Sequence, residues 1–204
     1  DLPAVFDLDM AMRGEMPIHW SDSYPARLGV MPRNGTDAEV SWYDINPCYV
    51  FHPCNAFETP DGRITLDVVA HATMFADSKI GPNAATSAFE RWTIDPAAQR
   101  VTRVVVDASP QEFPRPDERL LGQPYRYAYS AGLQPDGAGE FVGASHLIRH
   151  DLHTGARDLH DFGPGCHVGE FVFEPKHAGA GETAGWLMGL VVNAVTQTTD
   201  FVIL

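Results

Sequence analysis

Short strand-like segments recur along the whole chain, and they restrict its fold more than any other feature of the sequence. Runs of β-branched and aromatic residues alternate with clusters of Gly, Pro and Asp, whereas helical periodicity is scarce. The helical candidates are short, at residues 10–14 and 83–89. The predicted strands are 64–69, 89–94, 101–106, 145–150, 156–162, 186–192 and 201–204. The sequence therefore predicts an all-β fold.

Two of the predicted hairpins share one sequence pattern. Their first strands end at Asp95 and Asp151, which occupy matching places in that pattern. A strand-built repeat of about 50 to 60 residues, the range into which this interval falls, is typical of a β-propeller blade. A β-sandwich, the structural alternative, requires no such period. We expect residues 1–204 to form one partial β-propeller domain, an arc of about three to four blades.

The two ends of the chain indicate that this arc belongs to a longer protein. The chain starts at Asp1 without an initiator methionine, and it stops at Leu204 inside a predicted strand. A chain that stops there leaves an unpaired strand edge, which natural proteins usually cover. We therefore expect the domain to be truncated at both ends.

One histidine closes an apolar run. Residues 48–51 are followed by His52, which stands between Phe51 and Pro53 and has little conformational freedom. A restrained imidazole at the mouth of a strand is suited to bind a metal ion. The alternative is a hydrogen-bonded core histidine, which is the commoner use of a lone His in an apolar setting.

Two carboxylates accompany this histidine along the chain. Glu112 and Glu170 each precede a phenylalanine, and the interval from His52 to Glu112 is nearly equal to the interval from Glu112 to Glu170. Near-equal spacings indicate equivalent places in successive structural units. If these places converge on one axis, the carboxylates would accept the second N–H of metal-bound imidazoles. The alternative is that they cap strands or pair with arginines such as Arg115.

The segment around His52 resembles a known motif. Residues 51–58, F-H-P-C-N-A-F-E, are similar to the F-H-x-x-N-A motif, followed by Phe or Tyr and then Glu or Asp, of the carotenoid cleavage oxygenases. That family includes stilbene-cleaving dioxygenases and a retinoid isomerase. Five further segments resemble family motifs in the same order: D-L-P at 1–3, R-L-G-V-M-P-R at 27–33, E-F-P at 112–114, Y-R-Y-A-Y at 125–129 and G-E-F-V-F-E-P at 169–175.

The resemblance implies a seven-bladed propeller with one Fe(II) ion on its axis. In that family four histidines hold the iron, and glutamates orient three of them. The matches imply that His52 is the third iron ligand and that Glu112 and Glu170 orient iron-bound histidines. The other three histidine ligands match nothing here and should lie outside residues 1–204. No catalytic residue is expected beyond the metal site, and the chain by itself is expected to be inactive.

The resemblance also implies a reaction. The longer protein should cleave an alkene C=C bond of a carotenoid or apocarotenoid with O2 to give two carbonyl products. The alternatives are a stilbene-cleaving dioxygenase of the same family and a propeller binding module without chemistry. Phe51, Phe113 and Phe171 are candidates to line a tunnel for an apolar polyene or aromatic alkene, and burial in the core is the alternative for each.

Charge and cysteine content restrict the partners and the compartment. The formal net charge of −13 argues against nucleic acid as a partner. No apolar run is long enough to predict a transmembrane segment, although peripheral membrane contact of the longer protein is compatible with the family. Three cysteines without a C-x-x-C pair predict a reducing compartment, the cytoplasm. The remaining histidines receive no functional role. His146, His150, His153 and His160 cluster around one predicted hairpin, but their spacings on strands put the side chains on mixed faces, and His71 has no supporting neighbours.

Overall fold

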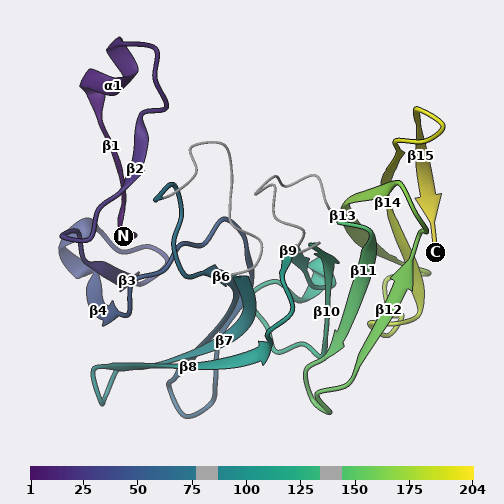
Figure 1. Cartoon of the computed structure of the whole chain (residues 1–204). Helices are drawn as coiled ribbons and strands as arrows, with labels where there is room; N and C mark the ends of the chain where they lie inside the picture. Colours follow the sequence, from purple (N-terminus) through teal and green to yellow (C-terminus); the bar gives the residue numbers. More distant parts are fainter. Residues whose placement is uncertain (77–86, 134–143) are drawn as a thin grey trace.

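Antiparallel sheets follow one another along the chain and form an arc of propeller blades (Figure 1). The computed structural model describes residues 1–76, 87–133 and 144–204. Each strand pairs with its neighbours in sequence, so every sheet is a simple meander. This order confirms the prediction of an all-β fold and of an incomplete propeller.

Two of the sheets are complete four-stranded blades. The first contains β5 (Pro53–Glu58), β6 (Ile64–His71), β7 (Ser87–Asp95) and β8 (Arg100–Asp107). The second contains β9 (Gln111–Arg115), β10 (Tyr127–Gly132), β11 (His146–Asp151) and β12 (Arg157–Asp161). Asp95 and Asp151 each end the third strand of a blade, so the sequence period that they mark is the spacing between blades.

Smaller sheets flank these two blades. Three strands form the next blade: β13 (Cys166–Pro175), β14 (Gly185–Asn193) and β15 (Thr198–Ile203). On the other side β3 (Ala26–Val30) pairs with β4 (Ser41–Ile45). The 3-10 helices η1 (Asp37–Glu39) and η3 (Glu118–Leu120) lie in connections. Figure 1 shows the sheets side by side in chain order, from β3 and β4 to β15.

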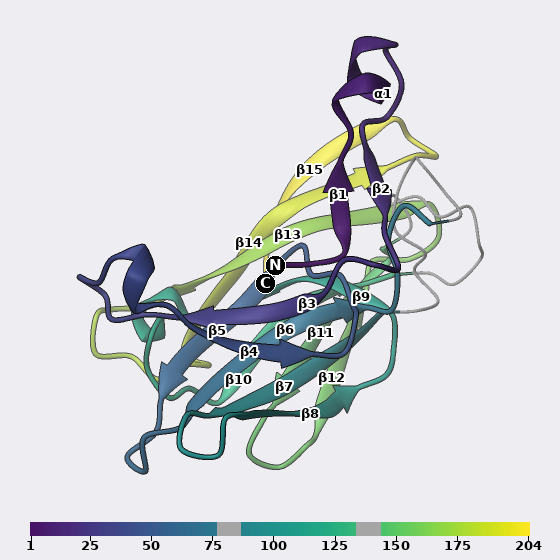
Figure 2. The same ribbon diagram turned by 90° about the vertical axis from the view of Figure 1, so that its left-hand side faces the viewer.

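An arm formed by the first twenty residues stands away from the blades (Figure 2). It contains β1 (Ala4–Phe6), α1 (Leu8–Met12) and β2 (Ile18–Trp20), and β1 pairs with β2. Asp7 caps the start of helix α1, because its side chain accepts a hydrogen bond from the Met10 N–H at 3.0 Å. Within the described residues, no helix has the length and apolar content needed to cross a membrane.

The predicted strands all appear, and one local prediction was wrong. The short helix predicted at 83–89 is wrong in its described part, because residues 87–89 start β7. Its other residues, 83–86, lie outside the described part of the chain. The apolar run 48–51 forms no regular strand, since Tyr49 makes only an isolated bridge to His71 and β5 begins at Pro53, directly after His52.

The apolar core lies between successive sheets, as in a propeller. One cluster joins β6 and β7 to the start of the second blade through side chains that include Val69, Phe89, Tyr125 and Ala128. A second joins the two later blades, and a third lies between the first blade and the β3–β4 sheet. Packing sheet on sheet in this way sets the position of each blade relative to the next.

Candidate metal centre

Each blade begins with a strand whose pairing is interrupted close to one predicted site residue. In β5 the register shifts between Pro53 and Asn55, directly after His52. In the second blade it shifts beside Glu112, and in β13 it shifts between Val168 and Phe171, which enclose Glu170. Such β-bulges turn a side chain out of the regular pleat. The structure therefore places all three residues at or next to a bulge in the first strand of a blade: His52 directly before β5, Glu112 in β9 and Glu170 in β13.

The structure brings His52 and Glu112 together. The His52 Nδ1 lies 2.9 Å from Glu112 Oε2. The His52 side chain is 42% exposed, whereas the Glu112 side chain is completely buried at 0%. A carboxylate accepts hydrogen bonds only, so the Nδ1–H of His52 donates and its Nε2 keeps a lone pair. This is the arrangement that prepares an imidazole to bind a metal through Nε2.

The backbone next to Glu112 is held in an uncommon conformation. Phe113 has φ of +55°, in the left-handed region that residues with a side chain rarely adopt. Its N–H then donates to Glu112 Oε2 at 2.9 Å. Strained conformations of this kind persist where the surrounding structure requires them, often at functional sites. Here the strained bulge adds a second donor to the oxygen that holds His52.

Two polar contacts between blades hold β5 against the second blade. In the first, the buried Asn55 side chain donates to Leu120 O at 3.0 Å and Gln123 O at 3.1 Å, and it accepts from the N–H of Ala56 and Gly122. Its hydrogen-bonding capacity is therefore used completely. This explains the asparagine three residues after His52, since the side chain fixes where the strand of His52 lies relative to the strand of Glu112.

The second contact between the blades is buried more deeply. The Tyr125 hydroxyl donates to Asp67 Oδ2 at 2.6 Å and lies 3.4 Å from Cys54 Sγ. Arg91 completes the group with two hydrogen bonds of 2.8 Å to Asp67. Burial raises the pKa of Cys54 to about 12 and raises that of Tyr125, so both stay protonated. All three cysteines of the chain are free thiols.

Glu170 lies in a different environment. Its Oε1 accepts a hydrogen bond from Arg115 Nη1 at 2.8 Å, and its side chain is 42% exposed. Arg115 also pairs with Glu118. This ion pair is the alternative considered from the sequence, and within the described residues no histidine is bound to Glu170. Its role toward a metal-bound histidine stays a prediction.

The three phenylalanines lie at different depths. The Phe113 ring is 5.0 Å from the His52 ring, and the Phe51 ring stacks on His52 at 6.2 Å. Both are half-buried. Phe171 is 3% exposed and packs inside the core between the last two blades. Phe51 and Phe113 therefore border the imidazole, whereas the contacts of Phe171 are those of a core residue.

The sequence analysis missed His71. This residue ends β6, is completely buried, and places Nε2 2.6 Å from Glu112 Oε1. The signal was available, because His71 follows the apolar residues 68–70 just as His52 follows residues 48–51. Nothing in the chain pattern, however, connects a residue at position 71 with the carboxylate of position 112.

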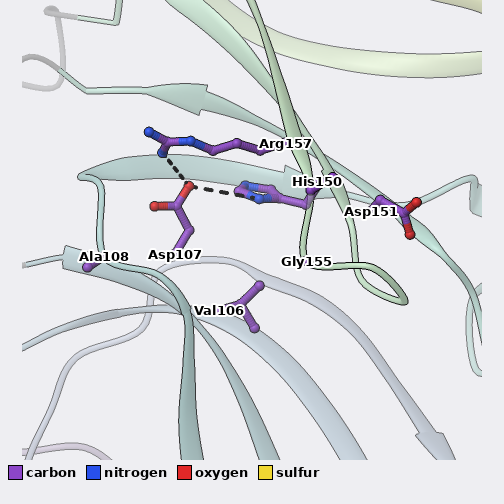
Figure 3. A pocket seen from close by; sticks show the side chains of 8 residues that line it. Val106, Asp107, Ala108, His150, Asp151, Gly155 and Arg157 are labelled. Atoms are coloured by element: carbon purple, nitrogen blue, oxygen red, sulfur yellow. Dashed lines mark hydrogen bonds and ion pairs between the residues drawn. The ribbon is translucent and has the colours of Figure 1, made fainter.

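A separate cavity of about 280 Å³ lies between the first two blades at the end of β8 (Figure 3). Arg157 donates to Asp107 Oδ2 at 2.8 Å there, and His150 Nδ1 is 3.9 Å from the same oxygen. His150 Nε2 is 2.8 Å from Gln111 Oε1. Burial lowers the pKa of His150 to about 4, so this histidine is neutral at pH 7. The cavity lies at a junction between blades, and the Arg157–Asp107 ion pair lines it.

The residues present fit one part of a metal site. Neutral imidazole suits ferrous iron, and a carboxylate behind it raises its basicity. Within the described ranges no three His, Cys, Asp or Glu side chains form a group that could hold a metal ion. Among the described residues, His52 Nε2 is the atom whose surroundings fit a metal ligand.

The propeller fold and the His52–Glu112 pair are both expected of a metal-dependent propeller protein, and comparison with known proteins identifies the family. The family described as retinal pigment epithelial membrane protein matches residues 1–204. A carotenoid cleavage oxygenase of Mycobacterium tuberculosis is 41% identical over 183 residues, which cover 85% of this chain and 36% of that protein. The chain belongs to the carotenoid cleavage oxygenase family.

Further relatives agree with this assignment. The apocarotenoid-15,15'-oxygenase of Synechocystis is 31% identical over 211 residues, covering 100% of this chain and 41% of that protein. The crystal structure of the cobalt-substituted Synechocystis enzyme superimposes with a TM-score of 0.79 at 29% identity, over 93% of this chain and 40% of that one. The chain thus spans 36% to 41% of the length of these two curated relatives.

Proposed function

We propose that the whole protein is an Fe(II)-dependent oxygenase that cleaves an alkene C=C bond with O2, and that this chain supplies one side of its metal site. The observation that carries the proposal is the contact of 2.9 Å between His52 Nδ1 and the buried Glu112 carboxylate. That contact leaves Nε2 as the metal-binding atom on a partly exposed imidazole. The membership of the chain in an oxygenase family supports the same function.

The residues of the chain act on the metal site by position and charge. Glu112 fixes the tautomer of His52 and holds the plane of its ring. Bound iron would supply the activation of O2. A neutral histidine ligand would leave the positive charge of the iron uncompensated, which favours that activation. Phe51 and Phe113 shield the imidazole from water and offer an apolar surface to an alkene. Glu170 is proposed to orient a histidine from the rest of the protein, because it lies at a bulge in the first strand of its blade, as Glu112 does.

The proposed substrate is a carotenoid or apocarotenoid. The support is the similarity to relatives whose names contain these substrates. The test uses the purified whole protein, loaded with Fe(II) and supplied with O2 and either an apocarotenoid or a hydroxylated stilbene, with carbonyl products separated by chromatography. Products from the stilbene alone would favour the stilbene-cleaving alternative. No product from either substrate, together with no bound iron, would favour a propeller binding module.

Peripheral contact with a membrane is a further part of the proposal. The arm of residues 1–20 exposes Phe6, Leu8, Met12 and Met16 around a short helix. Apolar side chains presented on a projecting element can enter the interface of a bilayer. In the whole protein, replacing Phe6 and Leu8 by serine should reduce sedimentation with liposomes and leave iron content unchanged. Location in the cytoplasm stays a prediction, in agreement with the three free cysteines.

A further inference from the structure

The Glu112 carboxylate has a second histidine partner that the proposed function does not use. Oε2 accepts from His52 Nδ1 at 2.9 Å and from the Phe113 N–H at 2.9 Å. Oε1 lies 2.6 Å from His71 Nε2. Both side chains of this second contact are completely buried at 0% exposure. Glu112 thus bridges one exposed and one buried imidazole.

His71 is itself held firmly. Its backbone N–H and C=O form two hydrogen bonds of 2.8 Å with Tyr49, and it pairs with Ser87 in β7. Its ring meets the Phe51 ring edge-on at 5.6 Å. Tyr49 and Phe51 belong to the segment that ends in His52. A single residue therefore contacts both the carboxylate and the segment that carries the imidazole bound to it.

The hydrogen bonds assign one tautomer to each histidine. Because Nε2 of His71 faces a carboxylate oxygen, that nitrogen carries the proton, and Nδ1 is left with a lone pair. This Nδ1 is buried and has no hydrogen-bond partner among the described residues. A buried polar atom without a partner is unfavourable and calls for an explanation. The opposite tautomer would satisfy no more groups, and it would remove the donor from Glu112 Oε1.

We propose that His71 is a positioning residue of the metal site, which acts on His52 through Glu112. Its Nε2–H occupies the second carboxylate oxygen and stops the carboxylate from rotating away from His52. Without this donor, Oε1 would be a buried carboxylate oxygen with no donor among the described residues. Because a buried carboxylate oxygen without a hydrogen-bond donor is unfavourable, the Glu112 side chain would rotate toward water or another donor. His52 would then lose its orientation. The inference rests on the proposed function.

The test measures Fe(II) affinity of the whole protein by competition with a chelator, alongside thermal stability of the iron-free form. His71→Phe removes the donor and keeps a ring, and we expect Fe(II) affinity to fall roughly tenfold, at the lower end of the effect of losing an outer partner. His71→Gln replaces Nε2–H by an amide donor and should recover most of that loss. The matched control is His150→Phe, a buried histidine bonded to Gln111 beside Glu112. It should lose stability without losing iron affinity.

A double-mutant cycle separates positioning from general stabilisation. If His71 acts through Glu112, adding His71→Phe to Glu112→Gln should cost little further iron affinity. Fully additive losses, an equal loss in His150→Phe, or unchanged affinity in His71→Phe would each overturn the inference. A wild-type protein that binds no Fe(II) would overturn the proposed function and this inference together, whereas normal binding by His71→Phe would overturn this inference alone.

A measurement on the unmodified protein covers the case in which the variants fail to fold. In whole iron-free protein labelled with ¹⁵N-histidine, His71 should show a protonated Nε2 and an unprotonated Nδ1, and His52 should show the reverse. The same tautomer on both residues would overturn the proposed bridge.

Discussion

Glu112 and Glu170 both lie at a bulge in the first strand of successive blades, yet their surroundings differ. Glu112 is 0% exposed and receives three donors, from His52, His71 and the Phe113 backbone. Glu170 is 42% exposed and pairs with Arg115. The repeated backbone therefore presents a carboxylate at each position, while the side chains of neighbouring blades decide what the carboxylate does. Substitutions at the two sites can test this difference.

The largest effect on Fe(II) affinity is expected from removing His52, the exposed imidazole bound to Glu112. In the whole protein His52→Ala should reduce Fe(II) affinity by more than the roughly 100-fold that marks the upper end for loss of an outer partner. Cleavage should disappear with the iron, because a metal ligand is lost. Elemental analysis and product formation measure the two quantities on the same sample. Unchanged iron content would show that His52 is a hydrogen-bonded structural histidine and not a metal ligand.

The next effect is expected from Glu112→Gln. An amide keeps the shape but turns an NH2 group toward one of the three donors, so Fe(II) affinity should fall by roughly 10- to 100-fold. Stability should also fall, by about 1–3 kcal/mol, because a buried donor loses its partner. Chelator competition and denaturant unfolding of the iron-free protein measure the two losses. A loss of stability with unchanged affinity would make Glu112 a structural residue.

Glu170→Gln should separate the two properties. The exposed pair with Arg115 is worth at most about 1 kcal/mol, so stability should hardly change. If Glu170 orients another iron-bound histidine, affinity should still fall roughly 10-fold or more. The matched control is Arg115→Gln, which breaks the ion pair and leaves the carboxylate in place. Equal iron affinity in wild type and Glu170→Gln would reduce Glu170 to a surface ion pair and sharpen the contrast with Glu112.

The smallest effect on Fe(II) affinity is expected from substitution of His150. This residue should instead make the stability of the protein depend on pH. Its pKa is lowered to about 4 by burial, below the ordinary value of 6.5, so the folded protein holds it neutral while the unfolded chain binds a proton. Its contribution to stability is therefore complete above pH 6.5 and is lost as the pH falls toward 4. The loss should be on the order of 2–3 kcal/mol by pH 4.

His150→Phe should remove this pH-dependent part of the stability and leave Fe(II) affinity unchanged. Unfolding by denaturant at pH 7 and at pH 4.5 gives the free energy of unfolding of wild type and variant. The difference between the two proteins should change from one pH to the other. Equal pH dependence in both proteins would contradict the lowered pKa of His150.

Part of the candidate site could be predicted from the sequence because it depends on local order along the chain. The strand runs and the repeat that Asp95 and Asp151 mark follow from alternation and turn residues, and blades repeat at that period. The near-equal spacings of His52, Glu112 and Glu170 predicted that the carboxylates lie near metal-bound imidazoles, and the structure brings Glu112 to His52. Phe171 shows where this argument fails, since it follows Glu170 as Phe113 follows Glu112, while its ring is buried in the core.

The sequence by itself determined the class of fold, the blade period and the residue types offered at each bulge. Only the tertiary structure decided which of these residues meet. His71 touches Glu112 across 41 positions of the chain, and Arg115 reaches Glu170 across 55. Asn55 joins two blades across 65 positions. Such contacts depend on how sheets stack side chain against side chain, and no local pattern encodes that packing because its partners come from strands that are not neighbours in sequence.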